Sequence, residues 1–228
     1  MLSYISSALL AVSVLATGPD YTNNGSDWPN TCQSGEEQSP IDLVTDTDTS
    51  DSMEIIGYNY YDFVKAGYAV DDVSHKLDFS DDQLRANAEL QITFADDSQS
   101  YFTPKYFNWH TPSEHTVDGY QYDAELHIAH VIKGSGLTSE GDSLDANEEL
   151  PGAMISIFFD KAEGGETTNA FIDSMIAAII DGTQKIDMRQ FLSTVDMTDY
   201  WSYDGSLTVP PCTEGIKWSV IKSVQPIS

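Results

Sequence analysis

Four of the five histidines in the chain lie within 21 residues of one another, His110, His115, His127 and His130. A lone histidine is more often structural than a metal ligand, but so dense a cluster favours a metal site. Three imidazoles that leave a fourth position open are a known way to hold a catalytic zinc ion. Zinc in such a site lowers the pKa of a bound water to about 7 and supplies a hydroxide nucleophile near neutral pH.

Two segments with the alternating pattern of β-strands carry the histidines, residues 106–110 and 124–130, and a polar turn at Asp118-Gly119 separates them. Residues two apart on a strand share a face. If the two strands pair side by side, His110 and His127 lie on one wall of a pocket. The sequence therefore predicts part of a metal site on two adjacent strands.

Asn108 and Glu125 each lie two residues before one of these histidines and share its face. Glu125 could accept a hydrogen bond from the ring nitrogen of His127 that does not face the metal, which would orient that ligand. Asn108 has the same spacing from His110, but its amide oxygen is a neutral and weak ligand for zinc.

The composition predicts one globular domain with a strongly acidic surface. The chain has 228 residues, of which 40% are hydrophobic and 11% aromatic, enough for a substantial core. The formal net charge is −27, from 37 acidic and 10 basic residues. Such a field repels nucleic-acid phosphates and anionic membranes. We interpret the excess of acidic residues as a means of keeping the protein solvated in a saline medium. The alternative is an acidic surface without a special role.

The first 17 residues form an apolar run that ends before Gly18-Pro19. The run is short for a membrane span and resembles the hydrophobic region of a signal peptide. We expect residues 1–17 to be a signal peptide, residues 18–228 to be the mature domain, and the protein to be secreted. The alternative is a buried N-terminal segment. No later segment is long enough to span a bilayer once the signal is removed.

The two cysteines, Cys32 and Cys212, lie far apart in the sequence. In an exported chain two cysteines predict a single disulfide. Two unpaired thiols are the alternative.

The rest of the chain is dominated by short strands with polar breaks between them. An apolar segment with helical spacing ends at Asp181-Gly182, which is a typical helix stop. We expect a helix over 171–180 and strands over 54–61, 63–73, 76–79, 89–94, 152–159, 200–203, 206–209 and 216–224.

Three segments in order along the chain resemble the α-type carbonic anhydrases. They are QSPIDL (38–43), HTPSEHTVDGYQYDAELHIAH (110–130) and YDGSLTVPPCTEGIKW (203–218). The resemblance runs from about Asp20 to Ser228 and is closest in character to exported algal or bacterial members, with an acidity similar to that of halotolerant algal ones. It implies a mainly β (α+β) single domain, with a large twisted, mostly antiparallel central sheet and few peripheral helices. Since members of the family continue past Ser228, it also implies that the C-terminal part of the fold is missing.

The same resemblance implies a zinc cofactor and assigns roles at the metal. His110 matches the second zinc ligand and His127 the third, whereas Asn108 stands where the family has its first ligand histidine. Thr208 matches the hydroxyl that accepts a hydrogen bond from the attacking hydroxide, and Glu114 matches the carboxylate that orients this threonine.

Further positions match the surroundings of the metal. Glu125 matches the partner of the third histidine, and Tyr106 stands in place of the glutamine that supports the first. Tyr68 takes the proton-shuttle position, where a tyrosine with a pKa near 10 transfers protons poorly at neutral pH. His115 matches a buried structural histidine, and we expect His130 and His75 to be structural too. The carbon dioxide pocket is matched by Ala129, Met154, Leu207, Ile216 and Trp218.

Two functions remain open on the sequence. The first is a zinc-dependent carbonic anhydrase, a lyase that hydrates carbon dioxide to bicarbonate and a proton, impaired by Asn108. If about 10–16 kcal/mol of zinc binding is shared over four positions, loss of one ligand weakens binding by on the order of a hundredfold to a thousandfold. The second is a catalytically inactive, carbonic anhydrase-related binding or matrix protein without zinc.

Overall fold

The computed structural model describes nine segments of the chain. They are residues 25–47, 53–60, 62–64, 67–70, 75–78, 88–133, 152–161, 168–181 and 185–228. The expected signal peptide, residues 1–17, lies outside them. No helix in these segments is long and apolar enough to cross a membrane.

Strands make up most of the described chain and helices are few. The strands are β1 (Asp42–Leu43), β2 (Met53–Asn59), β3 (Asp62–Val64), β4 (Gly67–Val70), β5 (His75–Asp78), β6 (Glu89–Phe94), β7 (Gln99–His110), β8 (Thr116–Val117), β9 (Tyr120–Gln121), β10 (Ala124–Ile132), β11 (Gly152–Lys161), β12 (Lys185–Asp187), β13 (Tyr200–Ser206) and β14 (Glu214–Ile227). The helices are α1 (Thr31–Ser34), α3 (Ala170–Asp181) and α4 (Met188–Leu192).

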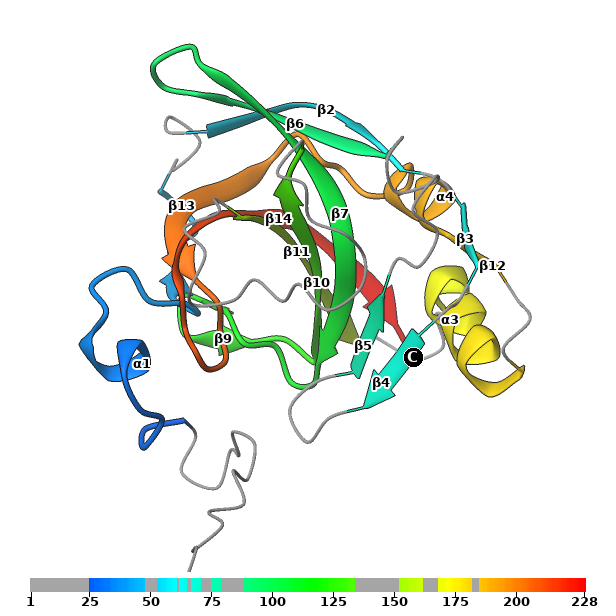
Figure 1. Cartoon of the computed structure of the whole chain (residues 1–228). Helices are drawn as coiled ribbons and strands as arrows, with labels where there is room; N and C mark the ends of the chain where they lie inside the picture. Colours follow the sequence, from blue (N-terminus) through cyan, green and yellow to red (C-terminus); the bar gives the residue numbers. More distant parts are fainter. Residues whose placement is uncertain are drawn as a thin grey trace, which may run out of the picture.

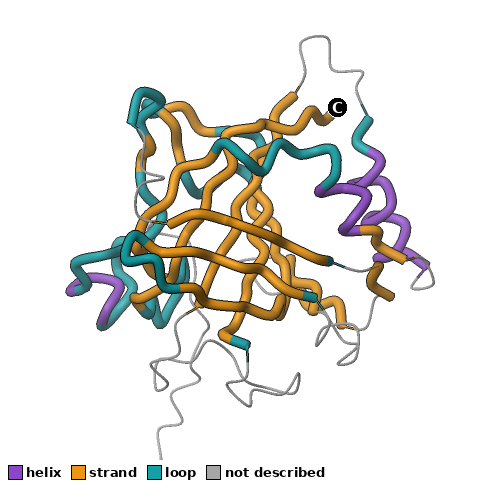
Figure 2. The backbone as a smooth tube through the Cα atoms, turned by 90° about the horizontal axis from the view of Figure 1, so that it is seen from above, coloured by secondary structure: helices purple, strands orange, loops and turns teal. Residues whose placement is uncertain are grey.

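Nine of the strands form one curved sheet (Figure 1). Seven run in the order β13-β14-β11-β10-β7-β5-β4, and β6 joins β7 to β2. Every pair in this sheet is antiparallel except β11 with β14. Seen from above, the helices α3 and α4 gather at one side of the strands and α1 lies at the other (Figure 2). The mainly β fold with a large, mostly antiparallel sheet and few peripheral helices is confirmed.

β10 is central in the sheet and almost wholly buried, because apolar side chains project from both of its faces. Leu126 and Ile128 belong to the larger apolar cluster of the core. Ala129, on the opposite face, belongs to a second cluster around Trp218. Glu125 and His127 share this second face by the period of two along a strand. The candidate site is therefore built on a rigid, doubly covered strand.

Two of the expected elements differ in the structure. The strand expected over 206–209 is wrong, because β13 ends at Ser206 and Leu207 and Thr208 begin a loop. Pro210 and Pro211 lack the N–H groups that a ladder needs. The strand expected over 63–73 divides into β3 and β4.

The helix expected over 171–180 is confirmed as α3, and a residue outside the expected range stabilises its start. Asn169 Oδ1 accepts hydrogen bonds from the backbone N–H groups of Phe171 and Ile172, at 3.1 and 3.4 Å. This is the capping interaction that asparagine provides at helix N-termini. Two further helices, α1 and α4, were not predicted. α4 is only five residues long, and Met188, Phe191 and Leu192 bury its apolar side.

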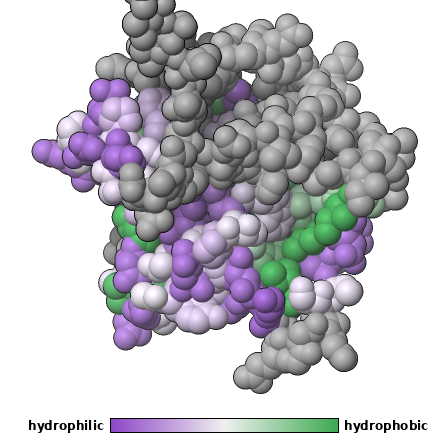
Figure 3. All heavy atoms as spheres, turned by 90° about the horizontal axis from the view of Figure 1, so that it is seen from below, coloured by the Kyte–Doolittle hydropathy of each residue, from purple (hydrophilic) through white to green (hydrophobic). Residues whose placement is uncertain are grey.

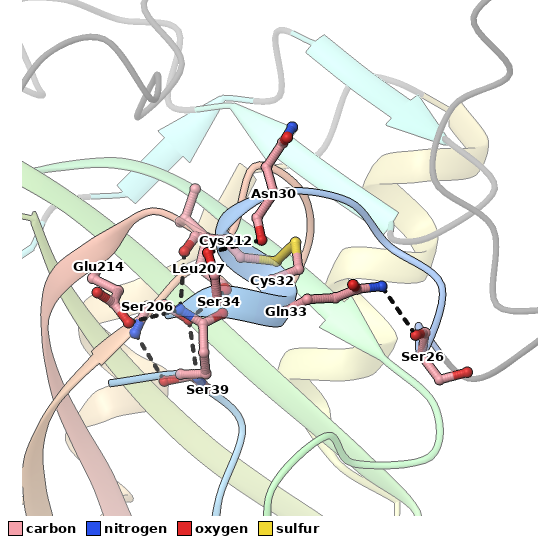
Figure 4. Close-up of a disulfide and its surroundings, with 11 residues drawn as sticks. Ser26, Asn30, Cys32, Gln33, Ser34, Ser39, Ser206, Leu207, Cys212 and Glu214 are labelled. Carbon is pink, nitrogen blue, oxygen red and sulfur yellow. Dashed lines mark hydrogen bonds between the residues drawn. A yellow bond between two sulfur atoms is a disulfide. The ribbon is translucent and has the colours of Figure 1, made fainter. Parts of the chain in front are cut away.

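The disulfide between Cys32 and Cys212 is confirmed, with an S–S distance of 2.05 Å (Figure 4). It ties α1 to the loop between β13 and β14. Nearby, Glu214 Oε1 accepts hydrogen bonds from the backbone N–H of Glu37 (2.7 Å) and from Gln38 Nε2 (2.9 Å). These contacts fix the N-terminal segment against the loop that carries Thr208.

One face of the molecule is largely polar. Among the coloured atoms in Figure 3, hydrophilic residues predominate, and hydrophobic ones form a diagonal band and a few smaller spots. With a formal net charge of −27, this surface repels other anions unless salt screens it.

Removal of the disulfide should lower the free energy of unfolding by about 5 kcal/mol, because the bond closes a loop of 180 residues in the unfolded chain. We expect the Cys32→Ser/Cys212→Ser variant to show this loss in urea unfolding. The natural chain in excess reductant is the matched control and should unfold at the same urea concentration as the variant. A double variant as stable as the oxidised chain would contradict the prediction.

Candidate metal centre

β7 and β10 pair side by side and bring the two predicted ligand histidines together. In the antiparallel register His127 lies opposite Asn108, and Glu125 lies opposite His110. The imidazole rings of His110 and His127 are 4.6 Å apart between centroids. Both histidines are buried, at 5% and 1% exposed. The two histidines therefore lie side by side on adjacent strands, as the strand pattern predicted.

Glu125 is fully buried and accepts hydrogen bonds from two backbone groups and three side chains. Its Oε2 accepts from the N–H groups of Glu114 and His115, at 2.7 and 2.9 Å. Its Oε1 accepts from His115 Nδ1 at 2.6 Å, His127 Nε2 at 2.7 Å and Ser156 Oγ at 2.5 Å. One carboxylate thus joins β10, β11 and the segment that follows β7.

The network shifts the pKa of Glu125 and that of its histidine partner. Burial opposes ionisation of Glu125, but attraction to His115 and His127 and their hydrogen bonds hold the pKa of this carboxyl well below its usual range. Burial also opposes protonation of His127, but Glu125 and Glu114 together raise the pKa of its imidazole. Because His127 donates Nε2–H to Glu125, its neutral ring carries the lone pair on Nδ1. His127 therefore presents Nδ1 to any ligand.

His115 is held by both of its ring nitrogens. Its Nδ1–H donates to Glu125, so its Nε2 accepts the hydroxyl proton of Tyr203 at 2.7 Å. The hydroxyl of Ser39 in turn donates to Tyr203, at 2.8 Å. A histidine with both nitrogens bonded inside the protein has no lone pair left for a metal, which agrees with a structural role.

Glu114 and Asn108 lie beside the two histidines that the sequence predicts as ligands. Glu114 Oε1 lies 3.2 Å from His110 Nδ1, and its Oε2 lies 3.8 Å from His127 Nδ1. Asn108 Nδ2 lies 2.7 Å from His110 Nε2. The other amide atom, Asn108 Oδ1, is buried and bonds to none of the residues that the structure describes.

These side chains fit a zinc ion. Ligand atoms of His110, Glu114 and His127 all lie within 4.8 Å of one another. Imidazole nitrogens with a carboxylate oxygen are a donor set that zinc accepts, and a fourth position is left for water. Asn108 Oδ1 is a further oxygen close by. It is buried, and no hydrogen bond from the described residues offsets the cost of burying it.

Comparison with known proteins identifies the family of this chain. The family model for eukaryotic-type carbonic anhydrases matches residues 23–228. This chain belongs to the carbonic anhydrase family.

Three relatives give the extent of the match. Alpha carbonic anhydrase 3 of Arabidopsis thaliana is 32% identical over 202 residues, which is 86% of this chain and 64% of that protein. Carbonic anhydrase 1 of Monodelphis domestica is 30% identical and covers 85% of this chain and 74% of that protein. The match to Alpha carbonic anhydrase 4 of Arabidopsis thaliana spans 40% of that protein's length.

Solved structures share the fold. A dioscorin in complex with ascorbate superposes with a TM-score of 0.64 at 25% identity, over 87% of this chain and 74% of that one. A halotolerant carbonic anhydrase from Dunaliella salina has a TM-score of 0.64 at 24% identity, over 92% of this chain and 84% of that one. At this identity the second likeness concerns the fold alone.

The residues expected from the family to line a carbon dioxide pocket all lie in one buried apolar cluster. Trp218 is its centre, fully buried and edge-on to the rings of His127 and His115, at 4.8 and 4.9 Å. Its indole N–H donates to the carbonyl of Ser206, so the ring turns apolar surface toward the histidines. The five residues of the expected pocket are Ala129, Met154, Leu207, Ile216 and Trp218.

The positions of three other expected site residues do not by themselves indicate a role. Thr208 is buried, at 9% exposed, in the loop after β13. Tyr106, on β7, packs against the apolar cluster around Trp218. Tyr68 lies on β4, opposite Leu77, and its side chain is outside the described residues, as is that of His75.

Ser156 and Tyr203 are site residues that the sequence analysis missed. Both lie on strands far along the chain from the histidines, and both bond to the network around Glu125. Ser156 carried a usable signal, because it is the one hydroxyl within the apolar run of residues 152–159. A lone polar residue in a buried strand needs a hydrogen-bond partner.

Two surface hollows lie away from the histidines, with volumes of about 330 and 570 Å³. The first is lined by Thr45, Asp46, Thr47, Thr198, Asp199, Tyr200 and Lys222. The second is lined by Glu54, Ile55, Gly57, Tyr58, Val195, Asp196, Met197, Thr198 and Tyr200. Neither lining contains a histidine.

His130 is fully buried and neutral, as its expected structural role requires. Tyr60 O–H donates to its Nε2 at 2.5 Å, and its Nδ1–H donates to the carbonyl of Ala153 at 3.3 Å. Burial lowers the pKa of His130 to about 3, although hydrogen bonds to the Ala153 and Ile128 carbonyls oppose this shift.

Acid should destabilise the protein in part through His130. Since the pKa of His130 is about 3 in the folded chain and about 6.5 when unfolded, the unfolded chain takes up the proton first. The contribution of His130 to the free energy of unfolding is therefore fully present above pH 6.5. It falls as the pH decreases toward 3, by up to about 1.4 kcal/mol per pH unit. Urea unfolding between pH 6 and pH 4.5 should show a smaller pH slope for His130→Gln. Equal slopes for the two proteins would contradict this assignment.

Proposed function

We propose that the chain is a zinc-dependent carbonic anhydrase, which reversibly hydrates carbon dioxide to bicarbonate and a proton. The observation that carries the proposal is the juxtaposition of His110 and His127 beside a buried apolar cluster, with Glu125 holding His127 so that Nδ1 is presented. Membership of the carbonic anhydrase family supports it.

The chain's own residues supply the zinc site. His110 and His127 would hold the ion, with Asn108 in the first ligand position of the family pattern. When bound, zinc acidifies a water molecule and supplies hydroxide near neutral pH. Glu125 fixes the ring of His127 before the metal arrives, which lowers the cost of ordering that ligand.

The apolar cluster supplies the place for the substrate. Carbon dioxide is uncharged and forms weak hydrogen bonds, so a wall of apolar side chains accepts it without leaving polar groups unpaired. Trp218 contributes ring surface because its one polar group already bonds to Ser206. Bicarbonate carries a charge and is disfavoured by the same wall, which assists its release.

Orientation and proton transfer rest on three further residues. Thr208 would accept a hydrogen bond from the nucleophile, and the family pattern assigns the orientation of this threonine to Glu114. Tyr68 at the shuttle position is a poor proton carrier near neutral pH, because phenols have a pKa near 10. Protons would therefore leave through water, and we expect a slow enzyme.

One observation favours a second candidate, a catalytically inactive carbonic anhydrase-related binding protein. The amide nitrogen of Asn108 lies 2.7 Å from His110 Nε2 and donates a hydrogen bond to it. This bond satisfies His110 without a metal. Zinc binding at that atom would have to displace it.

Export to an oxidising, saline medium is part of the proposal. The Cys32–Cys212 disulfide supports export, because such bonds persist outside reducing compartments. The net charge of −27 supports a medium with enough salt to screen it, and makes nucleic acid an unfavourable partner.

Replacement of Asn108 by histidine tests the function. A third imidazole should raise zinc affinity about ten- to a hundredfold, since it adds a strong ligand. Carbon dioxide hydration per chain at limiting zinc should rise with zinc occupancy. Both are measured on purified protein, by competition with a chromophoric chelator and by stopped-flow pH indicator. The matched control is Asn59→His, an exposed position on β2.

The outcomes separate the two candidates. Hydration above the buffer rate by the zinc-loaded natural chain supports the enzyme. If neither the natural chain nor Asn108→His hydrates carbon dioxide with zinc bound, the binding-protein candidate stands and the proposal fails.

A further inference from the structure

Glu114 lies next to both histidines that the proposed function assigns to zinc. Its side chain is 11% exposed, and those of His110 and His127 are 4% and 1% exposed. Both carboxylate oxygens face imidazole nitrogens, Oε1 toward His110 Nδ1 and Oε2 toward His127 Nδ1. The three residues converge within one small volume.

We propose that Glu114 is a zinc ligand in this protein, together with His110 Nδ1 and His127 Nδ1. The site would be of the two-histidine, one-carboxylate type, in which Glu114 takes the place of the missing third imidazole. The inference rests on the zinc-dependent function proposed above and deepens it by naming the ligand set.

The distances suit such a site. Zinc–nitrogen distances of about 2.0–2.1 Å and zinc–oxygen distances of about 2.0–2.2 Å place tetrahedral ligand atoms roughly 3.3–3.5 Å apart. Glu114 Oε1 lies 3.2 Å from His110 Nδ1, and Oε2 lies 3.8 Å from His127 Nδ1. With one ligand atom taken from each of the three residues, the atoms lie within 4.8 Å of one another, so they must draw together by about 1 Å at most. Small side-chain adjustments would therefore suffice.

Each histidine has a partner for its other nitrogen, which is what fixes a ligand imidazole. For His127 the partner is Glu125, at 2.7 Å. For His110 it is the amide of Asn108, at 2.7 Å from Nε2. An amide is nearly symmetric in shape, so turning it by 180° places Oδ1 at this contact, where it accepts Nε2–H. This rotation gives Asn108 Oδ1 the hydrogen bond that it otherwise lacks among the described residues.

Asn108 is then a positioning residue and not a weak ligand. It would hold His110 with Nδ1 toward the metal, as Glu125 holds His127. The loss of one histidine and the recruitment of Glu114 become parts of one rearrangement. A carboxylate also lowers the net charge of the zinc-loaded site by one relative to three neutral imidazoles.

The test measures zinc affinity by competition with a chromophoric chelator, which needs no activity. The full chain is compared with Glu114→Gln, and with Glu89→Gln as the matched control at an exposed ion pair with Lys133. Glu114→Gln should weaken zinc binding about a hundredfold to a thousandfold, because it removes one strong ligand. Glu89→Gln should bind zinc as the natural chain does.

A second background makes the result specific. In Asn108→His a third imidazole is present, so adding Glu114→Gln should cost less than about tenfold in zinc affinity. If Glu114→Gln does not fold, as judged by urea unfolding of the metal-free proteins, Glu114→Asp replaces it. That variant keeps the charge but withdraws the carboxylate by one methylene, and it should lose at least about tenfold.

Zinc binding by Glu114→Gln, or by Glu114→Asp if it is used, as tight as that of the natural chain would overturn the inference. The proposed function would survive that result if the zinc-loaded natural chain hydrates carbon dioxide. An equal loss in the natural and Asn108→His backgrounds would also overturn it, since Glu114 would then act on the fold. A natural chain that binds no zinc would overturn the inference and the proposed function together.

Discussion

The buried carboxylate of Glu125 is the interaction on which the site depends. A carboxylate without water is costly unless hydrogen bonds and opposite charge surround it. Here five donors do so, from Glu114, His115, His127 and Ser156. They come from two strands and the segment after β7, so ionised Glu125 requires these parts of the fold to be in place. The cost of burying this carboxylate is offset only in the folded arrangement, so arrangements that lack these donors are disfavoured.

The same carboxylate decides which ring nitrogen of His127 is available to a metal. By accepting Nε2–H it leaves the lone pair on Nδ1, beside Glu114. His115 is held in the opposite sense, with Nδ1–H toward Glu125 and Nε2 toward Tyr203. Two histidines bonded to one carboxylate thus have different roles. His127 keeps a ring nitrogen lone pair for a ligand, and His115 does not. Asn108 changes the chemistry beside this network without disturbing it, because it bonds to His110 and not to Glu125.

The features that could be predicted from the sequence are those that depend on local pattern. The period of two placed Asn108 with His110 and Glu125 with His127, and the paired strands are observed. The helix stop predicted at Asp181-Gly182 agrees with the end of α3 at Asp181. The fold class and the disulfide partners followed from family resemblance and from the presence of two cysteines alone.

What the sequence did not reveal depends on contacts across the sheet. Ser156 and Tyr203 join the network from β11 and β13, and no spacing along the chain relates them to Glu125. The expected strand over 206–209 failed because β-branched and apolar residues there resemble a strand, while the two prolines that follow remove its donors. The approach of Glu114 to both histidines is likewise a tertiary effect, since its position in the sequence indicates only that it is near His110.

The tautomers of the histidines test the central claim most directly. Long-range ¹H–¹⁵N NMR of the metal-free protein, at a pH high enough for neutral imidazoles, distinguishes Nδ1–H from Nε2–H rings. The account predicts Nε2–H for His127 and Nδ1–H for His115, with both signals perturbed in Glu125→Gln. An Nδ1–H tautomer for His127 would mean that Glu125 does not present its Nδ1 lone pair, and would contradict the account.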